Sequence, residues 1–320
     1  MGDKIITKKI PIYGKDTEPL QGVSNEYKTS HYAMRQPCLM YVSAVRNSGK
    51  SFSVSKLVTQ AQKENTFDRI YMITPTFLSN KSYFGKLIDE CDVYQPTKDS
   101  IQQVIEQVEQ DRDEYQEFKR KKKKYEEFVT VLKSKRELTD VEIFKFEDLG
   151  FLDVHISKPV WKYKYERPPT SMLIMDDILS SPAILQSSGL TKVATLNRHI
   201  GALDEPEQNR SACGLAVIII SQTYSMPQGV SRTLRENLTH LLIFRNKQEK
   251  QMGKIREELG SSVDENKFMI AYNHATKEKY GNLLIDFNPR CPSMTFRKNL
   301  NELIIFQDDS NECQCDKKNN

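Results

Sequence analysis

The chain has 320 residues, of which 38% are hydrophobic and 28% charged, and its formal net charge is +4. This composition is ordinary for a globular protein, and the slight basic excess is compatible with a nucleic-acid partner without demanding one. The longest apolar run, residues 215–220, is far shorter than the roughly 20 residues of a membrane span, so we expect a soluble, intracellular protein without such a span.

Short apolar runs alternate with helical patterns along most of the chain. Residues 1–36 are polar and rich in turn-forming residues, which predicts an N-terminal arm. Six apolar runs that end at turns or polar residues predict buried strands at 38–44, 69–74, 171–175, 216–221, 241–244 and 282–287. Helical patterns separate them, which favours an α/β fold with a mainly parallel central sheet flanked by helices. We therefore expect a core at 37–290 and a C-terminal extension with a polar tail at 291–320.

The segment at about 97–168 differs in kind and reads as a long, charged helical insertion. Apolar residues recur at helical spacing at its start, and the basic run Lys119–Lys124 follows. The helical pattern resumes over residues 140–147. The insertion is either a solvated, charged surface or a lever that faces DNA or a portal.

The strongest motif is a phosphate-binding loop between the first buried strand and the first helix. Residues 44–51 match the Walker A pattern G-x-x-x-x-G-K-[ST], except that alanine stands at the first glycine. Backbone N–H groups of such a loop cradle phosphates, its lysine reaches the β- and γ-phosphates, and its hydroxyl binds Mg²⁺. The predicted nucleotide-binding residues are Ala44, Asn47, Ser48, Gly49, Lys50 and Ser51.

An arginine inside this loop is unusual. Arg46 either supplies positive charge to the γ-phosphate within its own subunit or pairs with a carboxylate at the surface. The sequence leaves both interpretations open.

Two later strands end in polar side chains. Asp176 and Asp177 follow the apolar run 172–175 in the manner of a Walker B strand. Asp176 is placed to hold Mg²⁺ together with Ser51, and Asp177 is placed to orient or deprotonate the attacking water. Gln222 follows the next strand, which we expect to lie beside the first. Its amide can contact the γ-phosphate or the water, because ligands bind at the carboxyl edge of open α/β sheets.

This ordered set resembles the virion DNA-packaging ATPases of the FtsK–HerA superfamily, found in poxviruses, other large DNA viruses and virophages. The matching pieces are residues 44–51, 176–177, 197–199, 221–224 and 235–245. The resemblance spans residues 36–250 apart from the insertion, which lengthens the interval between Lys50 and Asp176. It implies a RecA-like P-loop NTPase core of the additional-strand type. It also implies the cofactors ATP and Mg²⁺.

The resemblance further implies a homo-oligomeric ring that moves double-stranded DNA, independent of sequence, into a viral capsid. In such rings an arginine from the neighbouring subunit completes each site, and Arg198, Arg235 and Arg245 are the candidates. Lys121–Lys124, Lys162, Lys164 and Arg167 are candidates for contacts with the DNA backbone. Capsid or portal-vertex proteins are the expected further partners, and the host cytoplasm (virus factory) or the virion is the expected location.

Two alternative functions stay open. A large-terminase-like packaging ATPase can also carry an arginine in its P-loop, but too few residues follow Asp177 for its nuclease domain. A nucleotide-binding accessory or scaffold protein would bind ATP without translocation, although the second carboxylate argues against an inactive site.

Overall fold

The computed structural model describes residues 5–10, 34–134, 137–147, 158–203, 214–224, 230–246, 248–259 and 263–308. Most of the expected N-terminal arm and the polar tail from residue 309 lie outside these ranges.

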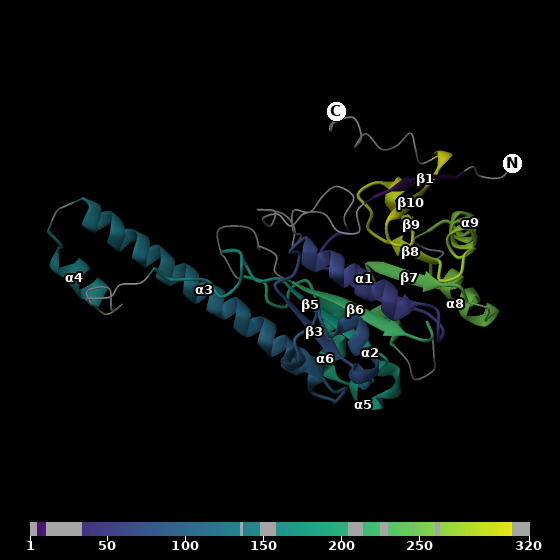
Figure 1. The fold of residues 1–320 in the computed structure, drawn as a ribbon, viewed down its shortest axis with the longest axis horizontal. Coiled ribbons are helices and arrows are strands. Elements are labelled where there is room, and N and C mark those ends of the chain that lie inside the picture. The colour runs from purple at the N-terminus through teal and green to yellow at the C-terminus, as the bar shows by residue number, and fades with distance from the viewer. Residues whose placement is uncertain are drawn as a thin grey trace.

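A ten-stranded sheet forms the centre of the molecule (Figure 1). Its order is β1-β10-β9-β8-β7-β2-β6-β5-β3-β4. The strands are β1 Ile5–Lys9, β2 Leu39–Ser43, β3 Arg69–Ile73, β4 Val93–Tyr94, β5 Ser171–Asp176, β6 Leu215–Ser221, β7 His240–Phe244, β8 Asn282–Asp286, β9 Phe296–Lys298 and β10 Glu302–Phe306. The part from β7 to β4 is parallel, whereas β8, β9, β10 and β1 pair antiparallel. All six predicted strands are confirmed, as is the position of β6 beside β2.

Helices cover both faces of this sheet. They are α1 Lys50–Lys63, α2 Phe77–Phe84, α3 Ser100–Lys133, α4 Asp140–Glu147, α5 Pro182–Leu185, α6 Ser188–Leu196, α7 Arg232–Glu236, α8 Glu249–Leu259 and α9 Glu265–Ala275. Three short 3₁₀ turns, Glu90–Asp92, Ile178–Ser180 and Pro292–Met294, connect elements. Within the described residues, no helix combines the length and the apolar character that crossing a membrane requires.

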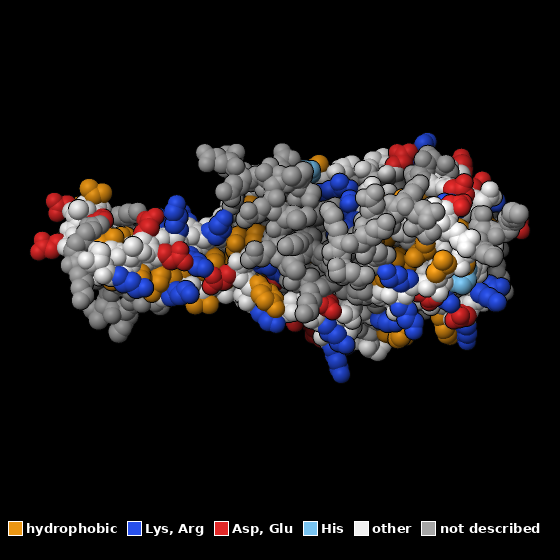
Figure 2. All heavy atoms as spheres, turned by 90° about the horizontal axis from the view of Figure 1, so that it is seen from above, with side chains coloured by type: hydrophobic (Ala, Val, Ile, Leu, Met, Phe, Trp, Pro, Cys, Tyr) orange, Lys and Arg blue, Asp and Glu red, His pale blue; other side chains and the backbone are white. Residues whose placement is uncertain are grey.

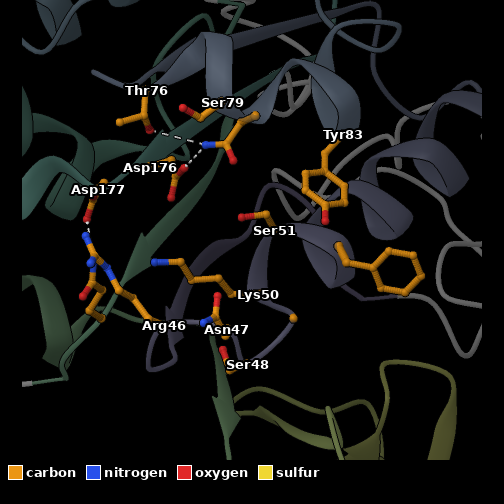
Figure 3. A pocket seen from close by; sticks show the side chains of 14 residues that line it. Arg46, Asn47, Ser48, Lys50, Ser51, Thr76, Ser79, Tyr83, Asp176 and Asp177 are labelled. Carbon is orange, nitrogen blue, oxygen red and sulfur yellow. Dashed lines mark hydrogen bonds between the residues drawn. The ribbon is translucent and has the colours of Figure 1, made fainter.

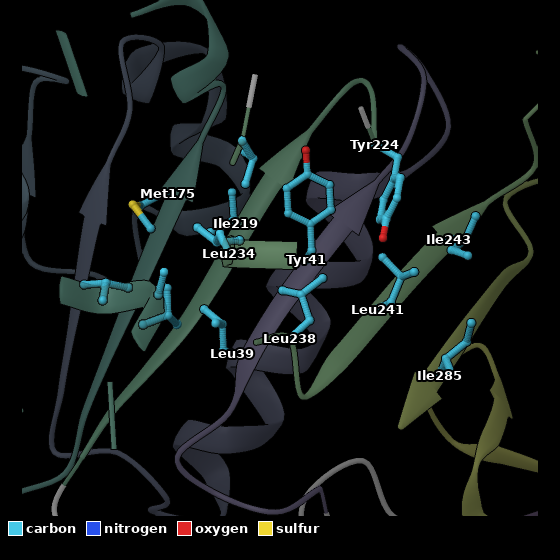
Figure 4. Close-up of a cluster of buried hydrophobic side chains, with 14 of the residues drawn as sticks. Leu39, Tyr41, Met175, Ile219, Tyr224, Leu234, Leu238, Leu241, Ile243 and Ile285 are labelled. Carbon is cyan, nitrogen blue, oxygen red and sulfur yellow. The ribbon is translucent and has the colours of Figure 1, made fainter. Parts of the chain in front are cut away.

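Successive residues of the parallel strands enter two different cores. Leu39 and Tyr41 of β2 pack on the face covered by α3, α6, α7, α8 and α9, and Figure 4 shows this cluster. Met40 and Val42 pack on the opposite face against α1 and the end of α2. Side chains alternate across a strand, so burial of both faces requires the continuous apolar runs seen in the sequence.

The insertion consists of a long helix anchored at one end. The first turns of α3 are buried in the main core through Ile101, Val104 and Ile105. Farther along, Tyr115 packs edge-on against Trp161 at 5.2 Å. The remainder of α3 projects from the body, and α4 lies at its far end (Figure 1). Acidic and basic side chains are interspersed along the projection (Figure 2), which agrees with a solvated helix.

The C-terminal part departs from the expected boundary at residue 290. Strands β9 and β10 continue the sheet beyond β8, and β1 from the N-terminal arm completes its edge by pairing with β10. Residues 291–308 therefore belong to the same sheet as the core. The sequence signal was weak because β9 spans three residues and includes a buried arginine, Arg297.

Candidate active site: a phosphate loop, two carboxylates and an amide at one sheet edge

The loop between β2 and α1 has the backbone that phosphate binding requires. Asn47 and Gly49 adopt positive φ angles of 59° and 90°. A Cβ at Gly49 would stand 3.3 Å from Cδ1 of Tyr280, so both the backbone conformation and the close neighbour favour glycine there. Gly49 caps α1 without a side-chain hydrogen bond, and Ser48 Oγ is buried with no partner among the described residues. The backbone N–H groups at the start of α1 and the Ser48 hydroxyl can donate hydrogen bonds to an anion.

The departure at the first motif position leaves the loop intact. Ala44 is buried, and its N–H donates to the carbonyl oxygen of Ser221 at 3.0 Å. The small side chain fits this position, and the bond ties the start of the loop to β6.

The first aspartate of the acidic pair is buried at the end of β5. Asn80 Nδ2 of α2 donates to Asp176 Oδ2 at 2.8 Å, whereas Asp176 Oδ1 has no hydrogen-bond partner among the described residues. Burial raises the pKa of Asp176 above its usual range and Asp177 adds to this effect, while Lys50 and Asn80 oppose it. A buried carboxylate with one unpaired oxygen is suited to a cation.

The second aspartate turns away from the strand. Asp177 has a φ of 58°, which is uncommon for a residue with a side chain, and its N–H donates to the carbonyl oxygen of Ile220 at 3.3 Å. Gln222 Nε2 donates to Asp177 Oδ1 at 3.3 Å. The amide that follows β6 thus holds the carboxylate that follows β5.

These groups line one cavity of about 550 Å³. Figure 3 shows Arg46, Lys50 and Ser51 on one side, with Asp176 and Asp177 facing them. The lining residues are Arg46, Asn47, Ser48, Gly49, Lys50, Ser51, Phe52, Thr76, Ser79, Asn80, Tyr83, Asp176, Asp177 and Gln222. Apart from Ala44, which is buried behind the loop, the structure brings every predicted P-loop, Walker B and glutamine residue together here.

Sequence reasoning missed the contribution of α2. Thr76, Ser79, Asn80 and Tyr83 reach the cavity from this helix and the turn before it. The available signal was Thr74 and Thr76 directly after β3, because this strand ends at the same edge of the sheet as β5 and β6.

A divalent cation fits the donors present. Ser51 Oγ and the unpaired oxygen of Asp176 are hard oxygen ligands in the same cavity. No group of three or more His, Cys, Asp and Glu side chains suited to a metal occurs within the described part of the chain. Mg²⁺ in nucleotide sites is held by one or two protein oxygens together with phosphate oxygens, so a small ligand set suffices.

Arg235, one candidate for an arginine acting across a subunit boundary, is engaged within its own chain. Its Nε and Nη2 donate to Glu258 at 2.9 and 3.0 Å, and its side chain is 8% exposed. Tyr224 also donates to Glu258, at 2.8 Å. A bidentate, buried ion pair occupies this guanidinium within its own chain, which disfavours Arg235 among the three candidates.

The other two arginines lie at opposite ends of the parallel strands, Arg245 at their carboxyl ends and Arg198 at their amino ends. Arg245 follows β7 and lines a second cavity of about 260 Å³, together with Arg46 and Tyr280, on the flank of the P-loop. Arg198 adjoins Asn197, whose carbonyl accepts from Leu215 N–H at the amino end of β6. Because β6 separates Arg198 from Gln222 by about 20 Å, only a neighbouring subunit could receive Arg198 at its site.

Most basic side chains near residue 164 pair within the chain. Lys162 Nζ contacts Asp111 at 2.6 Å, and Arg167 contacts Asp68 at 3.2 Å. Lys164 donates to the side chain of Asn65. Lys162 therefore ties the segment before β5 to α3, and Arg167 ties it to Asp68 before β3. Both charges are paired within the chain, which disfavours them as DNA contacts.

The strand order and the phosphate-binding loop define the class of protein. Strand β6 lies between the P-loop strand β2 and the acidic strand β5, with the site at their shared carboxyl edge. This is the arrangement of a P-loop NTPase of the additional-strand type, and the predicted fold class is confirmed.

No protein-family model and no curated protein matches the chain. Among solved structures it is similar to the genome-packaging NTPase B204 of Sulfolobus turreted icosahedral virus 2 with ATPγS, at 13% identity and a TM-score of 0.38, over 82% of this chain and 97% of that one. It is similar to B204, the DNA-packaging ATPase of Sulfolobus turreted icosahedral virus, at 12% identity and 0.40, over 82% and 96%. The pCW3 conjugation coupling protein TcpA with ATPγS gives 12% identity and 0.39, over 76% and 61%. At these values the assignment of the fold depends on the strand order and P-loop of this chain itself.

Proposed function

We propose that this protein is an ATP-driven motor that moves double-stranded DNA into a viral capsid. The observation that carries the proposal is the meeting of Lys50, Asp176, Asp177 and Gln222 in one cavity at the carboxyl edge of the sheet. They come from three segments that lie far apart in the sequence, so a chance match of one short motif does not explain their convergence. The packaging role itself derives from the resemblance of the ordered motifs to virion-packaging ATPases.

Each side chain has a chemical task in ATP hydrolysis. Backbone N–H groups of the loop and the Lys50 ammonium bind the phosphates and offset charge that develops on them. Ser51 and Asp176 would hold Mg²⁺, which supplies further charge compensation when bound. Asp177 supplies a second carboxylate in the cavity, which can orient the attacking water and accept its proton. Arg46, which also lines the cavity, adds positive charge within the same subunit.

A route from the site to the body of the protein begins at Gln222. Two residues on, Tyr224 donates to Glu258 of α8, and Glu258 is paired with Arg235 of α7. Tyr41 of the P-loop strand donates to the carbonyl oxygen of Thr223 at 2.7 Å. We propose that loss of the γ-phosphate shifts Gln222 and that this network transmits the shift to α7 and α8, as DNA movement requires.

The proposed assembly is a homo-oligomeric ring around the duplex. Arg198 becomes the leading candidate for the arginine supplied to a neighbour, because it lies far from its own site. Arg245 is the second candidate. Lys121, Lys123 and Lys124 on the projecting part of α3 are the proposed DNA or portal contacts, because they combine positive charge with distance from the ATP site. The proposed location is the host virus factory or the virion.

The test is ATP turnover with and without random-sequence duplex DNA, combined with displacement of a third strand from a triplex as the signal of translocation. We expect duplex DNA to stimulate turnover several-fold and the triplex strand to be displaced only with hydrolysable ATP. Lys50→Ala is the control and should abolish both signals, because it removes the phosphate contact. Turnover that is unaffected by DNA, with no displacement, would exclude the motor and favour an accessory nucleotide-binding protein.

A further inference from the structure

The two ends of the cavity differ in chemistry. Its lining residues include Asp176, Asp177 and Gln222 and also two aromatic side chains, Phe52 and Tyr83. Figure 3 shows Tyr83 beyond Ser51, on the side away from Asp177. Phe52 is 59% exposed, although α1 buries Val54, Leu57 and Val58. Tyr83 is 42% exposed, whereas the next residue of α2, Phe84, is fully buried. Large exposed rings at the rim of a polar cavity indicate a ligand surface.

The orientation of a bound triphosphate decides which part of the ligand meets these rings. Asp177 and Gln222 mark the γ-phosphate end, and Ser51 begins the helix whose N-terminus receives the phosphates. The nucleoside must then leave the cavity at the end opposite the carboxylates. Phe52 directly follows Ser51, and Tyr83 lies about one turn after Ser79 and Asn80, so α2 presents all three to the cavity.

We propose that Phe52 and Tyr83 form the base subsite of this nucleotide site, which binds bases by stacking and discriminates little between purine nucleoside triphosphates. The inference rests on the proposed nucleotide hydrolysis and adds to it the residues that bind the base. An aromatic ring stacks on every base because every base has a π face, and such contacts are tolerant of base identity.

Base selectivity requires fixed donors and acceptors aimed at the base edge. Among the described lining residues, the amides of Asn80 and Gln222 are engaged by Asp176 and Asp177 at the phosphate end. Both rings are exposed at the rim, so the edge groups of adenine and of guanine can keep hydrogen bonds to water. ATP and GTP should therefore bind with affinities within about fivefold of each other, since neither leaves a buried polar group unpaired.

A third exposed aromatic residue offers a matched control. Tyr280 is 54% exposed and packs against Gly49, but it lines the other cavity, with Arg245 and Lys279. Lys279 Nζ lies 4.9 Å from the centre of its ring, so a cation already covers part of this ring. We therefore assign the base to Phe52 and Tyr83, and Tyr280→Ala tests the competing assignment with a change of similar size.

The experiment measures dissociation constants of the Mg²⁺ complexes of ATP, GTP and inorganic tripolyphosphate for the wild type and for Phe52→Ala, Tyr83→Ala and Tyr280→Ala. Each of the first two changes should raise the dissociation constants of ATP and GTP about tenfold, which corresponds to the loss of a single base stack. The affinity of these variants for tripolyphosphate, which lacks a base, should stay within twofold of the wild-type affinity. All three rings are exposed, so the variants should fold, and Phe52→Trp should restore binding of ATP.

Several outcomes would overturn the inference. The base subsite would be rejected if ATP affinity were unchanged in Phe52→Ala and Tyr83→Ala, or if only Tyr280→Ala lost ATP affinity. It would also be rejected if the first two variants lost as much affinity for tripolyphosphate as for ATP. A preference for ATP over GTP greater than about fiftyfold would reject the low selectivity, because it requires specific hydrogen bonds to the base. Failure of the wild type to bind tripolyphosphate and both nucleotides would instead reject the proposed function on which the subsite rests.

Discussion

Replacement of Asp177 by asparagine isolates the proton-accepting carboxylate from the rest of the site. Asparagine keeps the Oδ1 atom that accepts from Gln222 at 3.3 Å. It also tolerates the φ of 58° that Asp177 adopts, because asparagine is among the residues enriched at positive φ. The change should therefore preserve the cavity and remove only the charge and the proton acceptor. Loss of a general base lowers kcat by about 10²- to 10⁴-fold, or about 3 to 5 kcal/mol in the activation free energy.

Single-turnover hydrolysis of labelled ATP measures the chemical step, and titration with a fluorescent ATP analogue in Mg²⁺ measures binding. For Asp177→Asn we expect the rate to fall at least a hundredfold with a dissociation constant close to that of the wild type. Asp176→Asn is the matched control, because it removes a neighbouring carboxylate that should also weaken binding of the Mg²⁺–ATP complex. A hydrolysis rate of Asp177→Asn within threefold of the wild type would place the base elsewhere.

Three further changes test the surroundings of the site. Gln222→Ala should uncouple ATP turnover from triplex displacement while changing ATP affinity less than threefold, because the amide contacts Asp177 and not the phosphate loop. Glu258→Gln should lower the free energy of unfolding in urea by about 3 kcal/mol, because it leaves the Arg235 guanidinium buried beside a neutral partner. Asp286 is buried within 3.5 Å of His240, and although burial alone would raise it, His240 and Arg297 hold its pKa below the usual range. Asp286→Asn should therefore flatten the acid side of the stability profile.

The sign of the last effect follows from linkage. A carboxyl group whose pKa is lower in the folded state stabilises that state above its unfolded pKa of about 3.9, and this contribution disappears as the pH falls through the folded pKa. The wild type should lose stability below about pH 4 more steeply than Asp286→Asn. Parallel profiles would contradict this account. A urea midpoint unchanged by Glu258→Gln would show that its pair with Arg235 contributes little, and coupled translocation in Gln222→Ala would remove that residue from the transmission route.

The central site could be predicted from the sequence because each of its main groups follows a buried strand. Continuous apolar runs identify β2, β5 and β6, and parallel strands end at the same edge of a sheet. Lys50, Asp176 and Gln222 therefore had to meet if the strands were neighbours. The structure adds that β6 lies between the other two.

The features that sequence reasoning missed depend on contacts between distant segments. Arg235 reads as a surface residue until α8 brings Glu258 beside it, 23 positions later. Lys162 reads as part of a basic patch, yet Asp111, 51 positions earlier, receives its ammonium group. Asn80 has no motif of its own, and its contact with Asp176 arises only because α2 begins where β3 ends, at the shared edge. Charge and polarity in a sequence do not reveal which partner the tertiary fold supplies.

The most direct test of the central claim is an experimental structure of the protein with Mg²⁺ and a non-hydrolysable ATP analogue, ideally with duplex DNA present. We predict the triphosphate in the loop with Lys50 at its β- and γ-phosphates, Mg²⁺ at Ser51 and near Asp176, and Asp177 and Gln222 facing the γ-phosphate. A nucleotide bound outside this cavity, or a γ-phosphate turned away from Asp177, would contradict the account.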